Sequence, residues 1–300
     1  MPAFDFLKNP ITKKWTILAP RRAKRPDFAN TSLDKPDMTA GSQPVCPFCP
    51  EKLISEEVLY SRTLEDGSKI TVVPNKFPFA PIHELVINTQ MHDLDLAMLP
   101  VEHLKGLLEV YKHRFNEHHH AGQVFILHNH GEKAGESIPH SHTQIAVLPE
   151  KVFLDAPQLS SVEKDLSSAL ATDHFMITCP ETSQWPDEVW VAPKARHKIY
   201  GEITDVQAAD LAHILSSLVR MFDLRYQKDF PFNFYIYPGS DWYLRIIPRN
   251  KVLGGVEVGT GVFINSQRPS ETLEFIKAHF ITLDPDRLAK EHLADYDRAL

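Results

Sequence analysis

The 300-residue chain contains few glycines, few cysteines and no excess of positive charge. With only 12 glycines, it has no glycine-rich low-complexity tract, and its 23 prolines instead punctuate ordered segments. The formal net charge of −7 excludes a general basic surface for nucleic acid, although it leaves room for a local anion pocket.

Long apolar runs are also missing. None approaches the roughly 20 residues that span a bilayer, and the N-terminal sequence lacks the charged-then-apolar form of a signal peptide. We therefore expect a cytoplasmic protein. Since 43% of its residues are hydrophobic, the chain can bury a substantial core in one large or two smaller domains.

Short apolar segments predict strands in both halves of the chain, and apolar residues three and four apart predict helices between them. Strands are expected at 14–20, 69–74, 84–88, 124–127, 144–148, 174–178, 188–192, 232–237 and 242–247. Helices are expected at 101–119, at 206–223 after a Thr204 cap, at 270–279 and at 284–300, and residues 21–50 are expected to form a loop.

The same order of elements occurs twice, which suggests a duplication whose halves have diverged. We expect the halves to be residues 1–160 and residues 161–300. In each half, the pattern predicts strands, a long helix and a final pair of strands, and the last strand ends at Pro149 or Pro248. This order favours an α+β fold with a mostly antiparallel sheet and flanking helices.

The Cys46-Pro-Phe-Cys49 motif predicts half of a metal site. Two thiolates on a tight turn suit tetrahedral Zn²⁺, and a CxxC in a reducing compartment favours metal over a disulfide. His92 and His140 are available as the two further ligands. The alternative is a pair of partly buried free thiols, which the ligand spacing and the proline-shaped turn make the weaker interpretation.

The segment from Asn129 to Gln144 carries the strongest indication of chemistry. His140, His142 and Gln144 are spaced by two, so on a strand all three side chains share one face. Two imidazoles and an amide make a poor core, and a neutral imidazole can attack phosphorus directly. A purely structural histidine pair is the alternative, and the alignment of three polar residues after a glycine-containing loop favours a site.

Groups around this segment are suited to a phosphate. The loop at residues 131–137 can present backbone N–H groups and the Ser137 hydroxyl, and Lys133 can add positive charge. Gln144 can donate a hydrogen bond to a phosphoryl oxygen without competing as a base. Residues 20–26 hold four cations that can clamp an anion, although such a run on its own is more often a solvated loop.

These motifs together resemble the galactose-1-phosphate uridylyltransferase family, a branch of the histidine-triad superfamily, and share features with its ADP-glucose phosphorylase branch. The resemblance covers nearly the whole chain. It runs from residues 15–26 through CPFC, Asn75-Lys-Phe-Pro78 and PHSHTQ to residues 251–265. It implies a duplicated histidine-triad fold and a homodimer.

The resemblance also implies a role for each matching residue. His142 matches the nucleophile that forms a covalent nucleotidyl-histidine, Gln144 the glutamine that replaces the third triad histidine, and Cys46, Cys49, His92 and His140 the zinc ligands. Ser137, Asn129, Arg22 and Arg25 match phosphate contacts, Asn75 a nucleoside contact, and Lys251 and Glu257 contacts to the hexose phosphate.

The implied reaction is transfer of UMP, or another nucleoside monophosphate, between a nucleotide sugar and a hexose 1-phosphate. Two departures bear on the substrate. Lys76 stands where uridylyltransferases commonly carry an acidic residue, and residues 254–265 lack a tyrosine that often precedes the glutamate. ADP-glucose phosphorylase or adenylyltransferase activity is therefore an alternative, and a zinc-stabilised nucleotide-binding module without turnover is another. In some members of the family, histidines in the strand that matches residues 241–248 bind a second metal. Because this stretch contains no histidine here, the resemblance implies a single metal.

Overall fold

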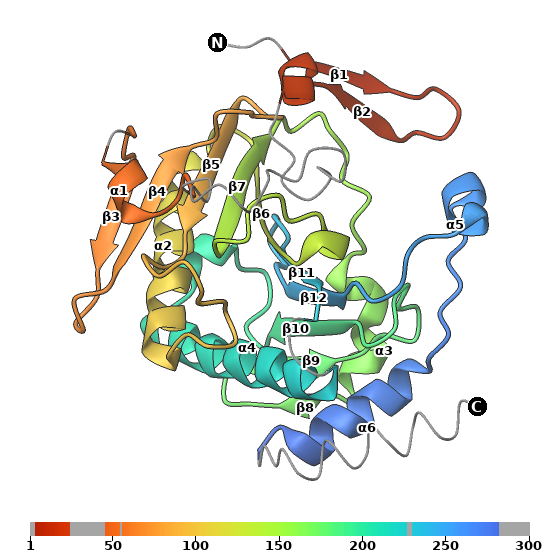
Figure 1. The fold of residues 1–300 in the computed structure, drawn as a ribbon. Coiled ribbons are helices and arrows are strands. Elements are labelled where there is room, and N and C mark those ends of the chain that lie inside the picture. The colour runs from red at the N-terminus through yellow and green to blue at the C-terminus, as the bar shows by residue number, and fades with distance from the viewer. Residues whose placement is uncertain (1–3, 25–45, 55, 227–229, 282–300) are drawn as a thin grey trace, which may run out of the picture.

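The computed structural model describes residues 4–24, 46–54, 56–226 and 230–281 (Figure 1). Its strands are β1 (Asp5–Lys8), β2 (Trp15–Leu18), β3 (Tyr60–Thr63), β4 (Lys69–Pro74), β5 (Ile82–Ile87), β6 (Gln123–His130), β7 (His142–Leu148), β8 (Leu170–Ala171), β9 (Phe175–Thr178), β10 (Val189–Pro193), β11 (Phe232–Ile236) and β12 (Leu244–Pro248). Its α-helices are α1 (Pro50–Leu53), α2 (Val101–His118), α3 (Glu163–Leu166), α4 (Asp205–Arg225), α5 (Gly255–Thr260) and α6 (Pro269–His279).

Within these described residues, ten strands form one antiparallel sheet in the order β3-β4-β5-β7-β6-β11-β12-β10-β9-β8. Read inwards from each edge, the two sides of the sheet follow the same order, and α2 and α4 occupy the same place in each. The sides join where β6 pairs with β11, with Asn129 opposite Asn233. The expected α+β class with an antiparallel sheet and flanking helices is confirmed. A domain boundary after residue 160 stays a prediction.

The expected elements match the structure closely where their apolar pattern was strong. Both long helices lie within two residues of their expected limits, and the Thr204 hydroxyl accepts from Gln207 N, as a capping residue does. The expectation omitted the short strands β1, β3 and β8, which have few buried side chains. Residues 21–24, expected in a loop, belong to a short 3-10 helix, and the helix expected at 284–300 lies outside the described residues.

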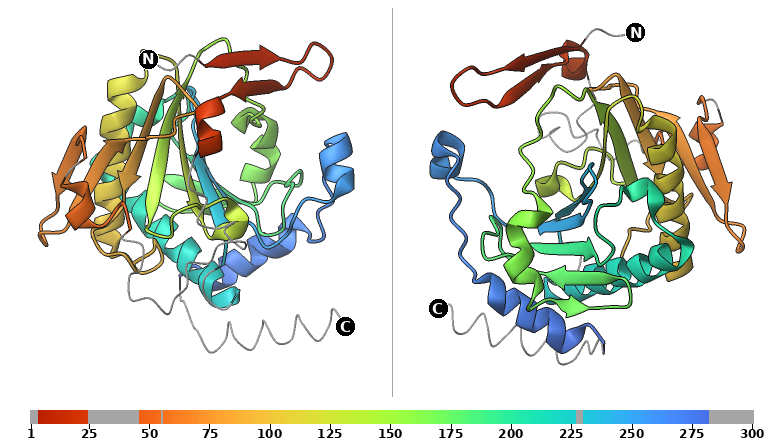
Figure 2. Two further views of the ribbon diagram at one scale, coloured as in Figure 1. Left: turned by 45° about the horizontal axis from the view of Figure 1, so that its top comes forward. Right: turned by 180° about the vertical axis from the view of Figure 1, so that it is seen from behind.

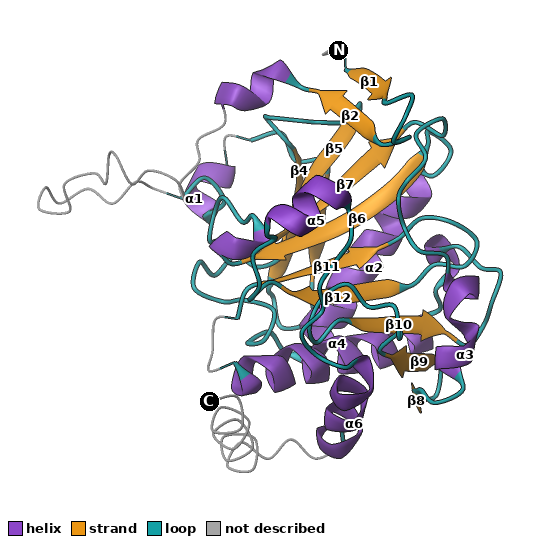
Figure 3. Cartoon of the chain, turned by 90° about the vertical axis from the view of Figure 1, so that its right-hand side faces the viewer, coloured by secondary structure: helices purple, strands orange, loops and turns teal. Residues whose placement is uncertain are grey.

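The two faces of the sheet have different surroundings (Figures 2 and 3). Helices α2 and α4 pack on one face, where alternate strand residues such as Val86, Ile126 and Ile145 join the main hydrophobic core. The intervening residues point to the other face. There Val73, Leu85 and Ile87 form a smaller cluster with Phe48, close to the predicted site.

A buried ion pair joins α2 to the sheet. Arg114 on α2 donates Nε and Nη2 to the two carboxylate oxygens of Glu84 on β5, at 2.8 and 2.6 Å, and His118 contacts the same carboxylate at 2.7 Å. Burial opposes ionisation of Glu84, but these hydrogen bonds outweigh it, so the pKa of Glu84 lies below its ordinary value. The pair therefore aligns the helix with the strand.

Among the described residues, no helix combines the length and the hydropathy that a membrane span needs.

Replacing Arg114 with Met tests this contact. Because the substitution leaves a buried carboxylate without its main partner, we expect the free energy of unfolding to fall by about 3–5 kcal/mol at neutral pH. Lys105→Met is the control, since Lys105 lies on the same helix in a more exposed pair, and it should cost under about 1 kcal/mol. Equal losses in urea unfolding would show that the buried pair does not stabilise the fold.

Candidate active site and metal centre

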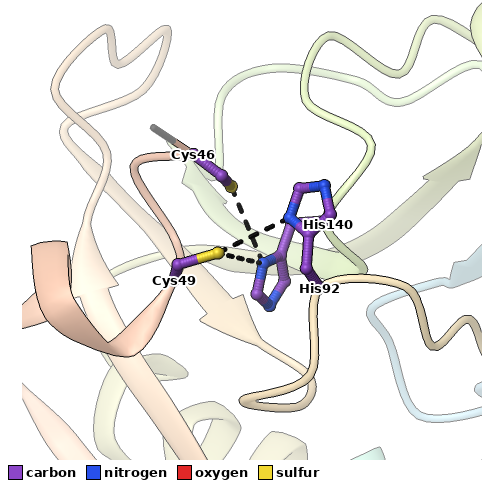
Figure 4. A group of neighbouring side chains, drawn as sticks. All are labelled: Cys46, Cys49, His92 and His140. Atoms are coloured by element: carbon purple, nitrogen blue, oxygen red, sulfur yellow. Dashed lines mark hydrogen bonds between the residues drawn. The ribbon is translucent and has the colours of Figure 1, made fainter. Parts of the chain in front are cut away.

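The four predicted metal ligands come together in space (Figure 4). The possible ligand atoms of Cys46, Cys49, His92 and His140 all lie within 4.8 Å of one another. The Cys46 Sγ atom is 3.7 Å from His140 Nδ1, and Cys49 Sγ is 3.6 Å from His92 Nδ1 and 3.8 Å from His140 Nδ1. The motif turn, the loop after β5 and the segment before β7 thus contribute to a single cluster.

These distances suit a tetrahedral metal. Zn–S bonds of about 2.3 Å and Zn–N bonds of about 2.0–2.1 Å place sulfur and nitrogen about 3.6 Å apart in a tetrahedron. The His140 Nε2–H donates to the backbone carbonyl of Thr89 at 2.8 Å, which turns the Nδ1 lone pair towards the thiols. Two thiolates and two imidazoles are a donor set for Zn²⁺, so the residues fit a structural zinc.

Both ligand types are tuned by burial. Burial and the neighbouring Cys46 raise the pKa of the Cys49 thiol to about 11, so in the absence of metal this thiol stays protonated at neutral pH. Burial lowers the pKa of His140, which favours the neutral imidazole that a metal requires. Metal binding at this cluster would therefore release a proton and stabilise the fold together.

A single backbone carbonyl group joins the cluster of Cys46, Cys49, His92 and His140 to His142. The Nδ1–H of His142 donates to the carbonyl oxygen of His140 at 2.9 Å, which leaves Nε2 as the ring nitrogen that carries the lone pair. Behind the strand, His128 Nδ1 lies 2.9 Å from the carbonyl of His142, and burial holds the pKa of His128 well below its ordinary range. Main-chain hydrogen bonds thus fix both the tautomer and the position of His142.

His142 forms part of the wall of a cavity of about 300 Å³. Gln144 and Ser137 line the same cavity, and so does Asn75, which reaches it from the loop after β4. The rest of the lining is mainly apolar and includes Phe48, whose ring centroid is 5.0 Å from that of His142. A mainly apolar cavity with an imidazole and a few polar side chains can hold an organic phosphate.

The loop between β6 and β7 is shaped by two glycines and one carboxylate. Gly131 and Gly135 have φ values of 80° and 83°, and a Cβ on Gly131 would lie 3.0 Å from Pro231. Glu136 accepts from the Gly131 N–H at 2.7 Å, and burial raises the pKa of Glu136. This compact loop ends at Ser137, which is 8% exposed.

Asn129, a predicted phosphate contact, is held from the second half of the chain. Asn233 donates its Nδ2 to Asn129 Oδ1 at 2.8 Å and to the Ala134 carbonyl at 2.9 Å, and Arg249 donates to Asn233 Oδ1 at 2.8 Å. The second half therefore supports both Asn129 and the loop before Ser137. The described lining of the cavity does not include Asn129 itself.

The remaining predicted residues fall into three groups. Arg22 lies beside the site, donating to the Phe77 carbonyl at 2.8 Å, and Phe77 lines the cavity. Arg25 lies outside the described residues. Lys251 and Glu257 pair with each other at 2.8 Å near α5, and neither belongs to the described lining of the cavity. Their assignment to the substrate stays a prediction.

His83, whose Nε2 lies 2.9 Å from Gln144 Oε1, was not among the predicted site residues. The strand was expected to begin at residue 84, whereas β5 begins at Ile82. A recognisable signal was present, because an imidazole two residues before Leu85 shares that residue's face of the strand. Asn233 was missed for a different reason: it lies in the other half, and only the β6–β11 pairing brings it to Asn129.

Known proteins resemble this chain along most of its length. Residues 28–151 match a family profile described as the N-terminal domain of DUF4931, a domain of unknown function. The chain is 26% identical to ADP-glucose phosphorylase of Arabidopsis thaliana over 93% of both chains. It is 24% identical to galactose-1-phosphate uridylyltransferase of Thermotoga maritima, over 88% of this chain and 94% of that one.

A solved structure of the Arabidopsis thaliana ADP-glucose phosphorylase with bound ADP-glucose shares the fold. Its TM-score is 0.68 at 23% identity, over 92% of this chain and 99% of that one. The chain is thus homologous to the galactose-1-phosphate uridylyltransferases and ADP-glucose phosphorylases and has their histidine-triad-like fold. These similarities support a nucleotidyltransferase or phosphorylase activity.

Replacing Cys46 with Ser tests the metal centre. Because the cluster would lose a thiolate and the turn that holds Phe48 would lose its anchor, we expect bound zinc and thermal stability to fall together. Elemental analysis by mass spectrometry and thermal unfolding measure the two effects. Cys179→Ala is the control, because Cys179 is buried in the main core and should affect stability but not metal content. Equal zinc in Cys46→Ser and the unaltered protein would remove Cys46 from the ligand set.

Proposed function

We propose that this protein transfers a nucleoside monophosphate between a nucleotide sugar and a phosphorylated acceptor, with His142 as the covalent nucleophile. The observation that carries the proposal is the hydrogen bond from His142 Nδ1 to the His140 carbonyl, on the wall of a cavity that also presents Gln144, Ser137 and Asn75. A fixed neutral imidazole facing a cavity suits attack on phosphorus better than it suits a purely structural role.

In the first step, Nε2 of His142 forms a bond to the α-phosphorus of the nucleotide sugar. The bond from that phosphorus to the bridging oxygen breaks, and the hexose 1-phosphate leaves with the electron pair. Nδ1–H stays bonded to the His140 carbonyl, which stabilises the positive charge that develops on the ring. Gln144 and Ser137, which line the cavity, are proposed to donate hydrogen bonds to the phosphoryl oxygens.

In the second step, a phosphate oxygen of the acceptor attacks the same phosphorus and the bond to His142 breaks. The ring returns to its neutral form, and one cavity serves donor and acceptor in turn. Arg22, Arg25 and Asn129 are proposed to bind phosphate oxygens, and Asn75 to contact the nucleoside. Lys251 and Glu257 are proposed to contact the hexose phosphate.

The proposed zinc has a structural role. Bound by Cys46, Cys49, His92 and His140, it would hold the segment before β7 and keep the His140 carbonyl facing His142. The zinc would make this segment rigid and would not bind substrate, because the four protein ligands fill its tetrahedral coordination.

The acceptor is proposed to be a hexose 1-phosphate, as in the galactose-1-phosphate uridylyltransferases. A second candidate is phosphorolysis of ADP-glucose, in which inorganic phosphate is the acceptor. The similarity to ADP-glucose phosphorylase over 93% of both chains favours it. Lys76 also favours it. This residue lines the cavity with its Nζ 2.6 Å from Glu56 Oε1, whereas uridylyltransferases commonly carry an acidic residue at the same position.

Intact-mass spectrometry after mixing with one nucleotide sugar at a time tests the nucleophile and names the nucleotide. We expect the protein to gain the mass of UMP or AMP, and His142→Ala to gain nothing while keeping its circular dichroism and zinc. His213→Ala is the control, since His213 is exposed on α4 and should form the adduct normally. An adduct on His142→Ala would disprove the assignment, and no adduct on the unaltered protein would favour a non-catalytic binding module.

We also propose a homodimer in which the segment around α5 contacts a second copy. This segment stands apart from the body of the molecule (Figure 1), and it exposes apolar side chains that include Val252, Val258 and Val262, at 73%, 75% and 62%. Several exposed valines on one short segment are more typical of an interface than of a solvated arm.

Sedimentation tests the dimer. We expect the protein to sediment at twice the chain mass, and Val258→Asp to raise the dimer dissociation constant at least about tenfold because a carboxylate would be buried. Val206→Asp is the control, since Val206 is 62% exposed at the start of α4. A monomer at micromolar concentration would contradict the proposal.

A further inference from the structure

A buried imidazole lies directly behind the polar wall of the cavity. His83 is 5% exposed on β5, and its ring contacts Gln144, which lines the cavity. The contact follows from sheet register: Leu85 is paired with Gln144 and His83 with Ala146, so His83 and Gln144 are diagonal neighbours on one face. Nothing in the proposed steps above uses His83.

The tautomer of His83 follows from a neighbour that can only donate. The backbone N–H of Phe79 points to His83 Nδ1 at 3.2 Å, so Nδ1 carries the lone pair and Nε2 carries the proton. The Nε2–H needs an acceptor, and Gln144 Oε1 lies 2.9 Å away. Asn75 Nδ2 is farther, at 3.2 Å, and its own Oδ1 accepts from the Phe77 N–H, so the Asn75 amide faces the ring as a donor and cannot accept this proton.

The orientation of Gln144 is then determined. With Oε1 accepting from His83, the Nε2 amide group of Gln144 is the end that is left to serve the cavity. We propose that His83 is a positioning residue that holds the Gln144 amide so that its N–H groups, and not its oxygen, face the phosphoryl oxygens. The reversed amide would present an electron-rich oxygen to a developing negative charge and would oppose the reaction.

The His83 ring is itself well fixed. It packs against Phe79 with ring centroids 4.1 Å apart, and the guanidinium of Arg22 lies 5.3 Å from the centroid of the same Phe79 ring. An orienting group is effective only when its own rotamer is held, and here the packing against Phe79 and the hydrogen bond from the Phe79 N–H supply that restraint.

This inference rests on the proposed function for its effect on rate, but not for its structural content. Two substitutions separate the two hydrogen bonds of the ring, because asparagine can mimic Nδ1 and glutamine can mimic Nε2. His83→Asn keeps an acceptor for Phe79 and loses the donor to Gln144. His83→Gln keeps a donor at the Nε2 position. His279→Gln is the control for altering a buried histidine, since His279 lies on α6 and is fully buried.

The rate constant for forming the covalent nucleotide adduct, measured in single turnovers, is the first readout. We expect His83→Asn to lower it by about 10–100-fold at unchanged nucleotide-sugar affinity, somewhat less than removal of a transition-state donor outright. His83→Gln should recover most of the rate, and His279→Gln should match the unaltered protein. In a Gln144→Leu background, His83→Asn should cost nothing further, because His83 acts through Gln144. An unchanged rate in His83→Asn, or a full additional loss in the Gln144→Leu background, would overturn the proposal.

The tautomer is measured independently of turnover. Nitrogen-15 NMR of the metal-loaded protein should show His83 protonated at Nε2, with a coupling across the hydrogen bond or a shift of the Gln144 amide that disappears in His83→Asn. A proton on Nδ1, or a Gln144 amide unaffected by the substitution, would overturn the orientation even if the protein formed the adduct. Absence of the adduct with the expected NMR result would refute the proposed function alone.

Discussion

The hydrogen bond between His142 Nδ1 and the carbonyl of His140 is the contact on which the site depends. The ring of His140 belongs to the Cys/His cluster, and the carbonyl oxygen of the same residue fixes the tautomer of His142. Since only Ser141 separates the two histidines, a metal bound at the Cys/His cluster would also order His142 through a few covalent bonds. Phe48, from the turn between the two cysteines, packs against both rings and adds a second link.

The two halves of the sheet have taken different roles. On the face that carries the cavity in the first half, the second half packs Trp190 against Tyr243, with centroids 4.3 Å apart, and buries an ion pair between Arg245 and Glu188. Aromatic rings thus fill this part of the second half. It still contributes to the site, because Asn233 crosses the β6–β11 seam to hold Asn129 and the loop before Ser137.

Most of the fold and part of the site could be predicted from local pattern. Strands such as β4 and β7 were recognisable from their apolar runs, and the period-two spacing correctly indicated a shared face for His142 and Gln144. It was wrong for His140, because β7 begins at His142 and the His140 ring lies with the two cysteines instead. What could not be predicted depends on distant pairing. His83 contacts Gln144 only because of the register between β5 and β7. The position of Lys251 depends on the path of the chain from the end of β12 to α5. Short edge strands such as β3 bury too little to leave a pattern.

In the proposed reaction, Nε2 of His142 carries the nucleotide. Phosphorus-31 NMR of the trapped adduct, made with protein labelled with nitrogen-15 in histidine, tests this assignment at the atom concerned. We expect a phosphorus–nitrogen coupling to Nε2 of His142, with Nδ1 still protonated against the His140 carbonyl. A coupling to Nδ1, or a phosphate ester on Ser137 without any coupling to nitrogen, would rule the assignment out.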